Sequence, residues 1–205
     1  MLETLLSFAF ATSILALSPG PDNIFVLTQS IVFGKKFGLA TVFGLISGCL
    51  VHTTLLAFGV SAIIKESENL FMGIKIFGAL YLLYLAYKGY KSDATIAFSE
   101  ENTLRKTTRQ LFKEGFIMNV LNPKVSIFFL ALFPGFLFSA SVSTVIQFYI
   151  LGGIFMLVSL VIFSAIAILA GAISESIKKN KNIGHYLKWT QIVVFLCIAV
   201  FILWG

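Results

Sequence analysis

The stretch Ser18-Pro19-Gly20-Pro21-Asp22-Asn23 interrupts a long apolar segment near the N-terminus. Proline lacks an N–H and its ring clashes with the preceding turn, so two prolines here must break a helix. The flanking runs, Leu5–Leu17 and Ile24–Phe33, are about 20 Å and about 15 Å long as helices. Neither alone crosses a hydrocarbon core of about 30 Å, but together they do. Irregular backbone at membrane depth persists only where protein buries it or it lines a wet cavity, so we expect a functional centre here.

The composition is that of an integral membrane protein. Hydrophobic residues make up 58% of the 205 residues and charged residues only 12%, about half the charge of a soluble domain. Cys49 and Cys197 lie in separate apolar runs without a Cys-x-x-Cys pair, which argues against a disulfide scaffold, a redox site or a zinc site. We expect no metal and no cofactor. The start, Met1-Leu2-Glu3, carries no basic side chain, so no signal peptide is expected.

Six apolar segments are long enough to span a bilayer. They run approximately over residues 5–33 (broken), 37–64, 70–90, 115–138 (broken), 144–173 and 186–204. The polar stretch Lys91–Arg109 divides a single transmembrane domain, residues 1–205, into repeat one (about 1–90) and repeat two (about 110–205). With three spans per half, the second half has inverted topology. The predicted fold is therefore an all-α membrane protein of six transmembrane helices in two inverted three-helix repeats.

The distribution of basic residues predicts the orientation. Three loops on one face carry most of the 15 lysines and arginines: Lys35, Lys36, Lys88, Lys91, Arg105, Lys106, Arg109, Lys113, Lys178, Lys179, Lys181 and Lys188. The opposite face carries Lys65, and Lys75 and Lys124 fall inside spans. The positive-inside bias places the basic face, including the long middle loop, in the cytoplasm and both termini outside a cell (inner) membrane. The N-terminus would lie inside if the first segment does not span. The net charge of +6 thus reports orientation, and we expect no nucleic acid partner.

The two halves are broken at matching positions. The second half begins with a span interrupted at Leu121-Asn122-Pro123-Lys124, and two unbroken spans follow each break. Broken helices at equivalent places in two inverted repeats indicate the binding site of a secondary transporter. A proline kink without a role is the alternative for one break, but it explains two equivalent breaks less well.

The chain resembles the lysine exporter / threonine-homoserine efflux family (LysE/RhtB type) over essentially its whole length. The matching strings are Ser18–Asn23, Gly34-Lys35-Lys36-x-Gly38, Gly44-x-x-x-Gly48-x-x-x-His52, Lys75-x-x-Gly78-Ala79-x-Tyr81-Leu82 and Gly115-x-x-x-Asn119-x-x-Asn122-Pro123-Lys124. The last two spans match only in general character. The resemblance implies an inner-membrane exporter of amino acids or close derivatives, driven by an ion or proton gradient, and it leaves the substrate open.

Helix starts at the two breaks favour an anionic ligand. Pro21 and Pro123 suit the first helical position, where a missing N–H costs nothing, and Asn122 is a good N-cap. Ser18 or the backbone of Gly20 can cap the turn before Pro21. The free N–H groups and partial positive charge of such helix starts favour a carboxylate, for example that of an amino acid.

Asp22 and Lys124 are the charged residues of the two breaks. Asp22 could bind a substrate ammonium, carry a coupling proton, or serve only as a partner of the helix dipole. Lys124 opposes the dipole of its own helix and therefore needs an anionic partner, unless it snorkels to an interface. Because the breaks are equivalent in the two halves, we predict that Asp22 and Lys124 form an ion pair that a zwitterionic substrate would exchange.

Other polar and small residues complete the candidate site. Ser18, Pro19, Gly20, Asn23 and Asn119 join the residues above as candidates for substrate or ion binding, although both asparagines are equally suited to capping freed backbone. Gly44 and Gly48 are spaced for close helix packing. His52 is interpreted as a hydrogen-bonding residue or a proton relay. Lys75 either snorkels or lines the substrate path.

The sequence argues against one alternative to an amino-acid exporter and leaves two others open. A membrane enzyme would need clustered nucleophiles or metal ligands, and a single histidine and a single aspartate inside spans cannot form such a cluster. A channel with inverted broken helices is compatible with the sequence. An exporter of another solute or a cation is the runner-up, though a cation site favours more carboxylates at depth than Asp22. The expected partners are an amino acid, a coupling ion (H+), the lipid bilayer and, as a candidate assembly, a second copy.

Overall fold

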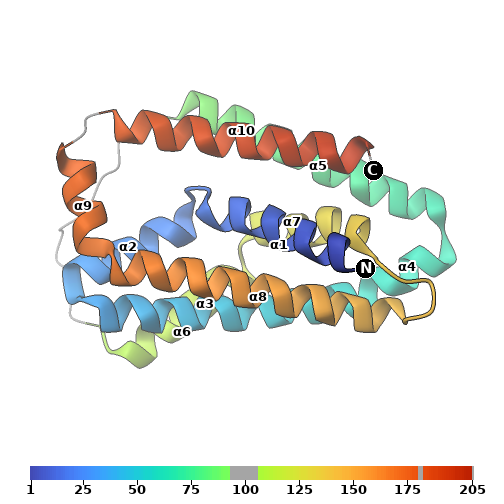
Figure 1. Cartoon of the computed structure of the whole chain (residues 1–205), viewed down its shortest axis with the longest axis horizontal. Helices are drawn as coiled ribbons and strands as arrows, with labels where there is room; N and C mark the ends of the chain where they lie inside the picture. The colour runs from blue at the N-terminus through green and yellow to red at the C-terminus, as the bar shows by residue number, and fades with distance from the viewer. Residues whose placement is uncertain (93–105, 180–181, 205) are drawn as a thin grey trace.

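The computed structural model describes residues 1–92, 106–179 and 182–204, and the elements of these three ranges are helical (Figure 1). The elements are α1 (Leu2–Leu17), α2 (Pro21–Phe33), α3 (Lys35–Leu55), the π-helix η1 (Leu56–Val60), α4 (Ser61–Glu66), α5 (Glu68–Lys91), α6 (Thr108–Val120), α7 (Pro123–Leu132), the 3-10 helix η2 (Phe133–Phe136), α8 (Thr144–Ile168), α9 (Ala170–Lys179) and α10 (Ile183–Trp204). The predicted all-α class is confirmed.

Four stretches are long and apolar enough to cross a membrane: Lys35–Ile63, Asn69–Lys91, Thr144–Ile168 and Gly184–Trp204. Two helix pairs qualify only when each pair is taken together, and both bend sharply at the predicted breaks. The bend is 59° between α1 and α2 and 52° between α6 and the run Pro123–Phe136. By length and composition the described chain thus holds four spans, or up to six if each bent pair is one span.

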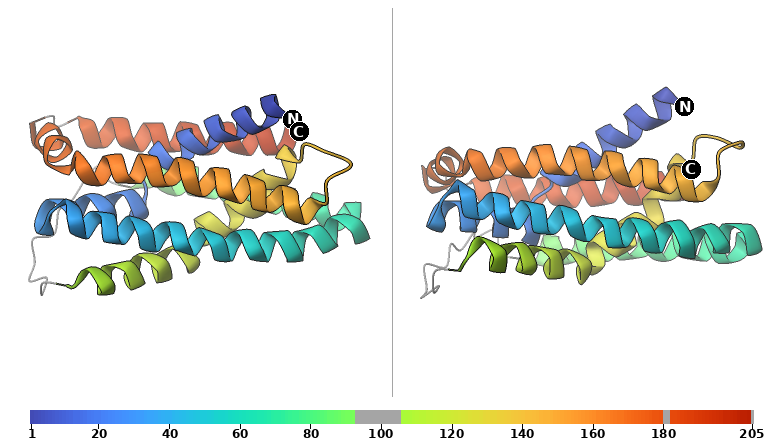
Figure 2. Two further views of the ribbon diagram at one scale, coloured as in Figure 1. Left: turned by 60° about the horizontal axis from the view of Figure 1, so that its bottom comes forward. Right: turned by 90° about the horizontal axis from the view of Figure 1, so that it is seen from below.

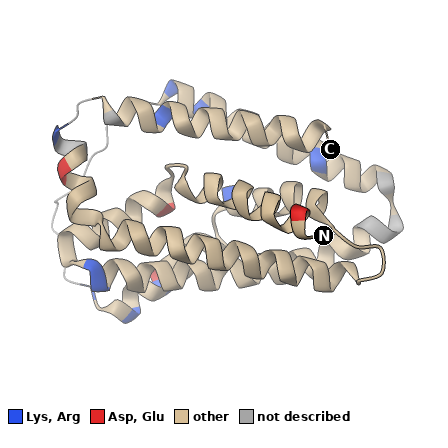
Figure 3. Ribbon diagram, in the orientation of Figure 1, with Lys and Arg blue, Asp and Glu red and all other residues tan. Residues whose placement is uncertain are grey.

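Helices of the two halves pack on one another in a reciprocal way. The third long helices, α5 and α10, lie side by side, and the second long helices, α3 and α8, also contact each other (Figure 1). Each second helix packs on the broken helix of the other half, α3 on α6 and α8 on α1. Both chain ends lie at the same end of the bundle (Figure 2). Most of the basic residues gather at the opposite end (Figure 3).

Glycines allow α3 and α6 to approach closely. A Cβ at Gly44 would collide with the carbonyl oxygen of Phe112, which belongs to the backbone of α6. A Cβ at Gly115 would lie 2.5 Å from the carbonyl oxygen of Thr41. Because backbone atoms cannot move aside cheaply, both positions require the absence of a side chain.

Two apolar clusters fill the bundle on either side of the breaks. Toward the chain ends, Phe8 lies edge-on to Phe133, with ring centroids 4.9 Å apart, and Phe133 stacks on Phe129 at 4.1 Å. Toward the basic end, a second cluster consists of buried residues of α2, α3 and α8 with Ala16: Ala16, Val26, Val42, Leu45, Phe163 and Ala167. The first cluster also includes residues of α5 and α10, among them Ala86 and Ile192, so it packs these two helices against the bundle.

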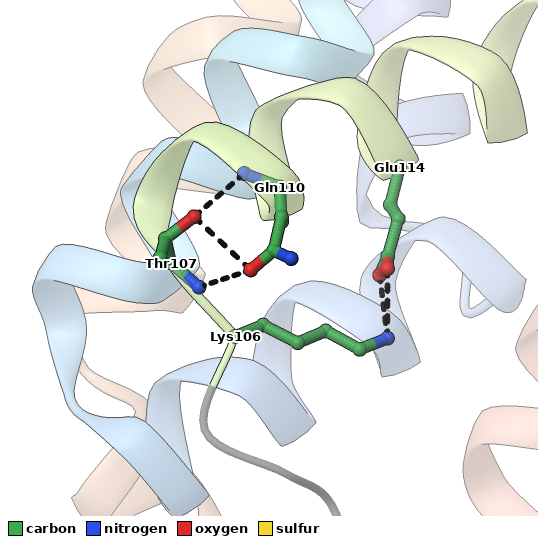
Figure 4. Close-up of polar contacts among 4 residues, drawn as sticks. All are labelled: Lys106, Thr107, Gln110 and Glu114. Atoms are coloured by element: carbon green, nitrogen blue, oxygen red, sulfur yellow. Dashed lines mark hydrogen bonds and ion pairs between the residues drawn. The ribbon is translucent and has the colours of Figure 1, made fainter.

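The ends of two predicted segments differ from the structure. The fifth span ends at Ile168 instead of residue 173, and α9 turns away from α8 as a separate short helix (Figure 1). The fourth begins at Thr108 instead of residue 115, because Thr107 and Gln110 form a capping box that starts α6 (Figure 4). An ion pair of 2.8 Å between Lys106 and Glu114 adds to this helix start. Most of the predicted Lys91–Arg109 loop, residues 93–105, lies outside the described residues.

Candidate functional site

The first break lies between α1 and α2. Ser18, Pro19 and Gly20 connect the two helices, and Pro21 is the first residue of α2. No side chain caps the N-terminus of α2, so its first N–H groups stay available. Asn23 Nδ2 instead donates to the carbonyl oxygens of Ala16, at 2.9 Å, and Ser18, at 3.3 Å. Its amide group therefore satisfies backbone that the break leaves without helical partners.

Asn122 joins the second break to the first. It is the N-cap of α7, and its Oδ1 accepts a hydrogen bond of 3.0 Å from the backbone N–H of Lys124. Its Nδ2 donates to both carboxylate oxygens of Asp22, at 3.2 Å and 3.4 Å. One side chain thus closes the start of α7 and contacts the carboxylate at the start of α2.

His52 satisfies the backbone at the second break. Pro123 has no N–H to offer the carbonyl oxygen of Asn119, four residues earlier. His52 Nε2, on α3, lies 3.0 Å from that oxygen, and the backbone N–H of Asn122 also donates to it at 3.0 Å. Because a carbonyl only accepts, Nε2 carries the proton, and Nδ1 of the neutral ring is an acceptor. Ser126 Oγ lies 3.4 Å from Nδ1 and also 3.4 Å from the Asn122 carbonyl oxygen, to which it donates.

A small enclosed cavity lies where the two breaks meet, and its volume is about 50 Å³. Its charged and polar lining is Ser18, Asp22, Asn23, Cys49, Asn119, Lys124 and Ser159, and its apolar wall includes Leu15, Val125, Phe128, Phe155 and Phe163. Ser18 Oγ and Asn119 Oδ1 are buried without a hydrogen-bond partner among the described residues. Unpaired buried polar atoms are costly, so their position at this cavity points to a polar ligand or ordered water.

The predicted ion pair between Asp22 and Lys124 is not formed in the described structure: the ion pairs there are Lys106–Glu114 and Lys179–Glu175. Asp22 is held by Asn122 instead. Lys124 Nζ lies 4.7 Å from the ring centroid of Phe195 on α10, a cation–π distance. The two charged groups nevertheless line the same cavity.

A second hollow meets the first break from the side of α10. It is lined by Pro19, Gly20, Pro21, Ile24, Phe25, Thr28, Met118 and Gln191, and it shares Gly20 and Pro21 with the enclosed cavity. A Cβ at Gly20 would lie 3.1 Å from Lys124 Nζ. The two hollows therefore meet at the backbone of the break, next to the Lys124 ammonium.

The remaining predicted residues lie around the cavity or away from it. Gly48 packs directly against the Asn119 side chain, since a Cβ there would be 2.6 Å from Asn119 Oδ1. Lys75, on α5, is half-buried and does not line the cavity. Sequence reasoning missed Phe195 and Ser159, because an apolar span gives no sign of which phenylalanine or serine turns toward a neighbour.

The profile of the LysE type translocator family matches residues 13–205. The chain belongs to the LysE type translocator family. This family consists of transporters, so the assignment as a multi-pass membrane translocator with a small-molecule substrate follows. In the described part of the chain, no three His, Cys, Asp or Glu side chains gather as metal ligands would.

Three curated proteins resemble this translocator. A homoserine/homoserine lactone efflux protein of Salmonella typhimurium is 31% identical over 86% of this chain and 84% of its own length. The protein of the same description from Salmonella typhi is 30% identical over the same shares. The uncharacterized membrane protein YrhP of Bacillus subtilis is 26% identical over 66% of this chain and 69% of its own. No solved structure gives a significant match.

Proposed function

We propose that this translocator exports amino acids or close derivatives from the cytoplasm and binds them at the cavity between the two helix breaks. The observation that carries the proposal is the composition of that cavity: one carboxylate, Asp22, one ammonium, Lys124, and two half-helix starts line a single small space. Such a pair of opposite charges at depth is costly unless a ligand or function uses it. An amino-acid zwitterion carries the complementary pair.

The substrate ammonium would bind Asp22, and its carboxylate would bind Lys124 and the free N–H groups at the start of α2. Helix starts favour a carboxylate through both these N–H groups and the helix dipole. Ser18 Oγ and Asn119 Oδ1 would serve further polar groups of the substrate. The Salmonella relatives are homoserine/homoserine lactone efflux proteins, so homoserine and its lactone are the first compounds to test.

Asp22 also offers a route to proton antiport. A protonated Asp22 loses the charge that attracts the substrate ammonium, so protonation would favour release and deprotonation would favour binding. This proton antiport would need no second carboxylate. Asn122 can donate to one carboxyl oxygen of Asp22 whether Asp22 is protonated or ionised. Efflux would then be driven by the inward proton gradient.

The experiment is efflux from cells preloaded with dipeptides, scored across all released amino acids, together with binding of the released compound to purified protein. Asp22→Asn and Lys124→Gln should each lower binding at least tenfold. Lys75→Gln is the matched control, because it removes an intramembrane lysine that does not line the cavity. Equal loss in the control, or unchanged binding in both cavity variants, would refute the proposed site. Efflux that neither saturates nor depends on a gradient would indicate a channel.

We further propose that the basic end of the bundle faces the cytoplasm. The charge distribution supports this orientation through the positive-inside bias, and both termini lie at the other end (Figure 1). A C-terminal reporter should be active only in an extracytoplasmic format, and a reporter inserted in the middle loop should report cytoplasm. A cytoplasmic C-terminus would overturn the orientation.

A further inference from the structure

Three lysines meet where the end of α5 lies beside the start of α10 (Figure 1). Lys88 and Lys91 are exposed in the last turn of α5. Lys188, near the start of α10, donates to the carbonyl oxygen of Ser92 at 2.7 Å. The sequence of α10 contains no acidic residue, and the one in α5, Glu68, stands at the far end of that helix. The three ammonium groups therefore concentrate positive charge without a carboxylate from their own helices.

Aromatic rings lie beside two of these lysines. Lys91 Nζ lies 4.9 Å from the ring centroid of Tyr87, and Lys188 Nζ lies 5.7 Å from that of Tyr90. The Tyr90 ring in turn meets the Trp189 ring edge-on at 6.0 Å. All three aromatic side chains are exposed. Tyrosine, tryptophan and lysine together are typical of the depth at which lipid headgroups lie.

An apolar stripe leads from this cluster along α10. Trp189, Val193, Leu196 and Val200 follow at helical spacings of four and three, so they share one face, and all four are exposed. The stripe ends in a shallow hollow to which Leu196, Val200 and Phe201 contribute. From Trp189 to Val200 the helix rises about 16 Å. One leaflet of the hydrocarbon core measures about 15 Å, half of its total thickness.

We propose that this face of α5 and α10 is a binding site for an anionic phospholipid. The headgroup phosphate lies among Lys88, Lys91 and Lys188, and one acyl chain follows the stripe from Trp189 to the hollow beside Phe201. Charge complementarity selects the anionic headgroup, because a zwitterionic headgroup offers no net charge to the three lysines. The stripe selects a lipid over a free phosphate. This inference does not depend on the transported substrate.

The test uses tryptophan fluorescence, since the chain contains only two tryptophans. Trp204→Phe leaves Trp189 as the single reporter at the headgroup end of the stripe. The protein is reconstituted in vesicles of brominated phosphatidylglycerol mixed with plain phosphatidylcholine, and in the reverse combination. Bromine quenches only at contact, so the two series give the relative affinity of the site for each lipid. We expect phosphatidylglycerol to be preferred at least about fivefold, which is the contribution of one lysine at an anionic surface.

The triple variant Lys88→Gln/Lys91→Gln/Lys188→Gln should abolish the preference. The matched control Lys35→Gln/Lys36→Gln/Lys113→Gln removes the same charge from the same end of the bundle and should keep it. If the triple variant fails to fold, Lys188→Gln alone replaces it and should lower the preference at least twofold.

Equal quenching by the two lipids would overturn the site, because the preference for phosphatidylglycerol would then be absent. Equal loss of the preference in both triple variants would also overturn it, because the attraction would then belong to the whole basic end. Glycerol phosphate added to the vesicles tests whether the site binds a lipid headgroup or a free phosphate. A millimolar concentration should leave Trp189 quenching unchanged. Full displacement would refute the acyl-chain part of the proposal.

Discussion

Asn122 carries two separable interactions, and substitutions can remove them one at a time. Its Oδ1 caps α7 through the N–H of Lys124, and its Nδ2 donates to Asp22. Asn122→Ser keeps an N-cap oxygen but loses the donor that reaches Asp22. Asn122→Ala loses both. The difference between the two variants therefore isolates the cap, and the difference between Asn122→Ser and the parent protein isolates the contact between the two breaks.

The magnitudes follow from the type of each interaction. Loss of an asparagine N-cap costs about 0.5–2 kcal/mol. Side-chain hydrogen bonds between transmembrane helices average only about 0.6 kcal/mol and reach about 1.7 kcal/mol. A carboxylate acceptor places the contact with Asp22 near the upper value. We therefore expect Asn122→Ser to lose about 1–1.7 kcal/mol and Asn122→Ala, which also loses the cap, about 1.5–3.7 kcal/mol. For a chain of this length each kcal/mol lowers the melting temperature by roughly 2–4 °C.

The assay is thermal unfolding of purified protein, arranged as a double-mutant cycle of Asn122→Ala with Asp22→Ala. Asp22→Asn is unsuitable for the cycle, because an asparagine oxygen still accepts from Asn122. A coupling of at least about 1 kcal/mol is expected, and efflux should fall at least tenfold in Asn122→Ser. Additive losses, with a coupling below about 0.3 kcal/mol, would show that Asn122 and Asp22 do not stabilise each other.

Four further substitutions test other parts of the structure. Pro21→Ala and Pro123→Ala should each let the halves of a broken span join, giving inserted protein with little efflux; normal efflux would make the breaks incidental. Gly44→Ala should cost about 1–3 kcal/mol in the free energy of unfolding, because its Cβ meets the backbone of α6; unchanged stability would contradict the close approach. His52→Gln should keep efflux and its dependence on external pH, since its amide can still donate to the Asn119 carbonyl; loss of the pH dependence alone would instead support a proton relay at His52.

The position of each break was predictable from sequence because proline acts locally. Pro21 and Pro123 remove hydrogen bonds whatever surrounds them, and both stand where their helices begin. The partner of Asp22 was not predictable in the same way. The equivalence of the two breaks predicted which segment lies beside Asp22, but not which residue of it. Asn122 donates to the carboxylate, and Lys124 contacts Phe195. Two residues of one helix turn point in different directions, and sequence gives only their order.

The end of the fifth span shows the limit of counting apolar residues. The sequence stays apolar to Ile173, yet the chain turns after Ile168. The α9 helix buries Ala170 and Ser174 and exposes Glu175 and Ser176, so it is an amphipathic helix and not the continuation of a span. Hydropathy along the chain measures composition and not the direction of the helix axis. The prediction from sequence therefore treated α8 and the start of α9 as one span.

Some polar side chains near the breaks are bonded to the backbone, and others remain at the cavity for a ligand. The breaks free backbone carbonyl groups, and neutral side chains donate to them: Asn23 to the carbonyl oxygens of Ala16 and Ser18, and His52 to that of Asn119. The donor groups of both side chains are bonded to the backbone, so a ligand could accept from them only if a hydrogen bond at a helix end were broken. Asp22 and Lys124 are the charges that remain at the cavity. One carboxylate and one ammonium at the cavity match the two charges of one zwitterion, as the proposed binding mode requires, and a proton on Asp22 would remove one half of that match.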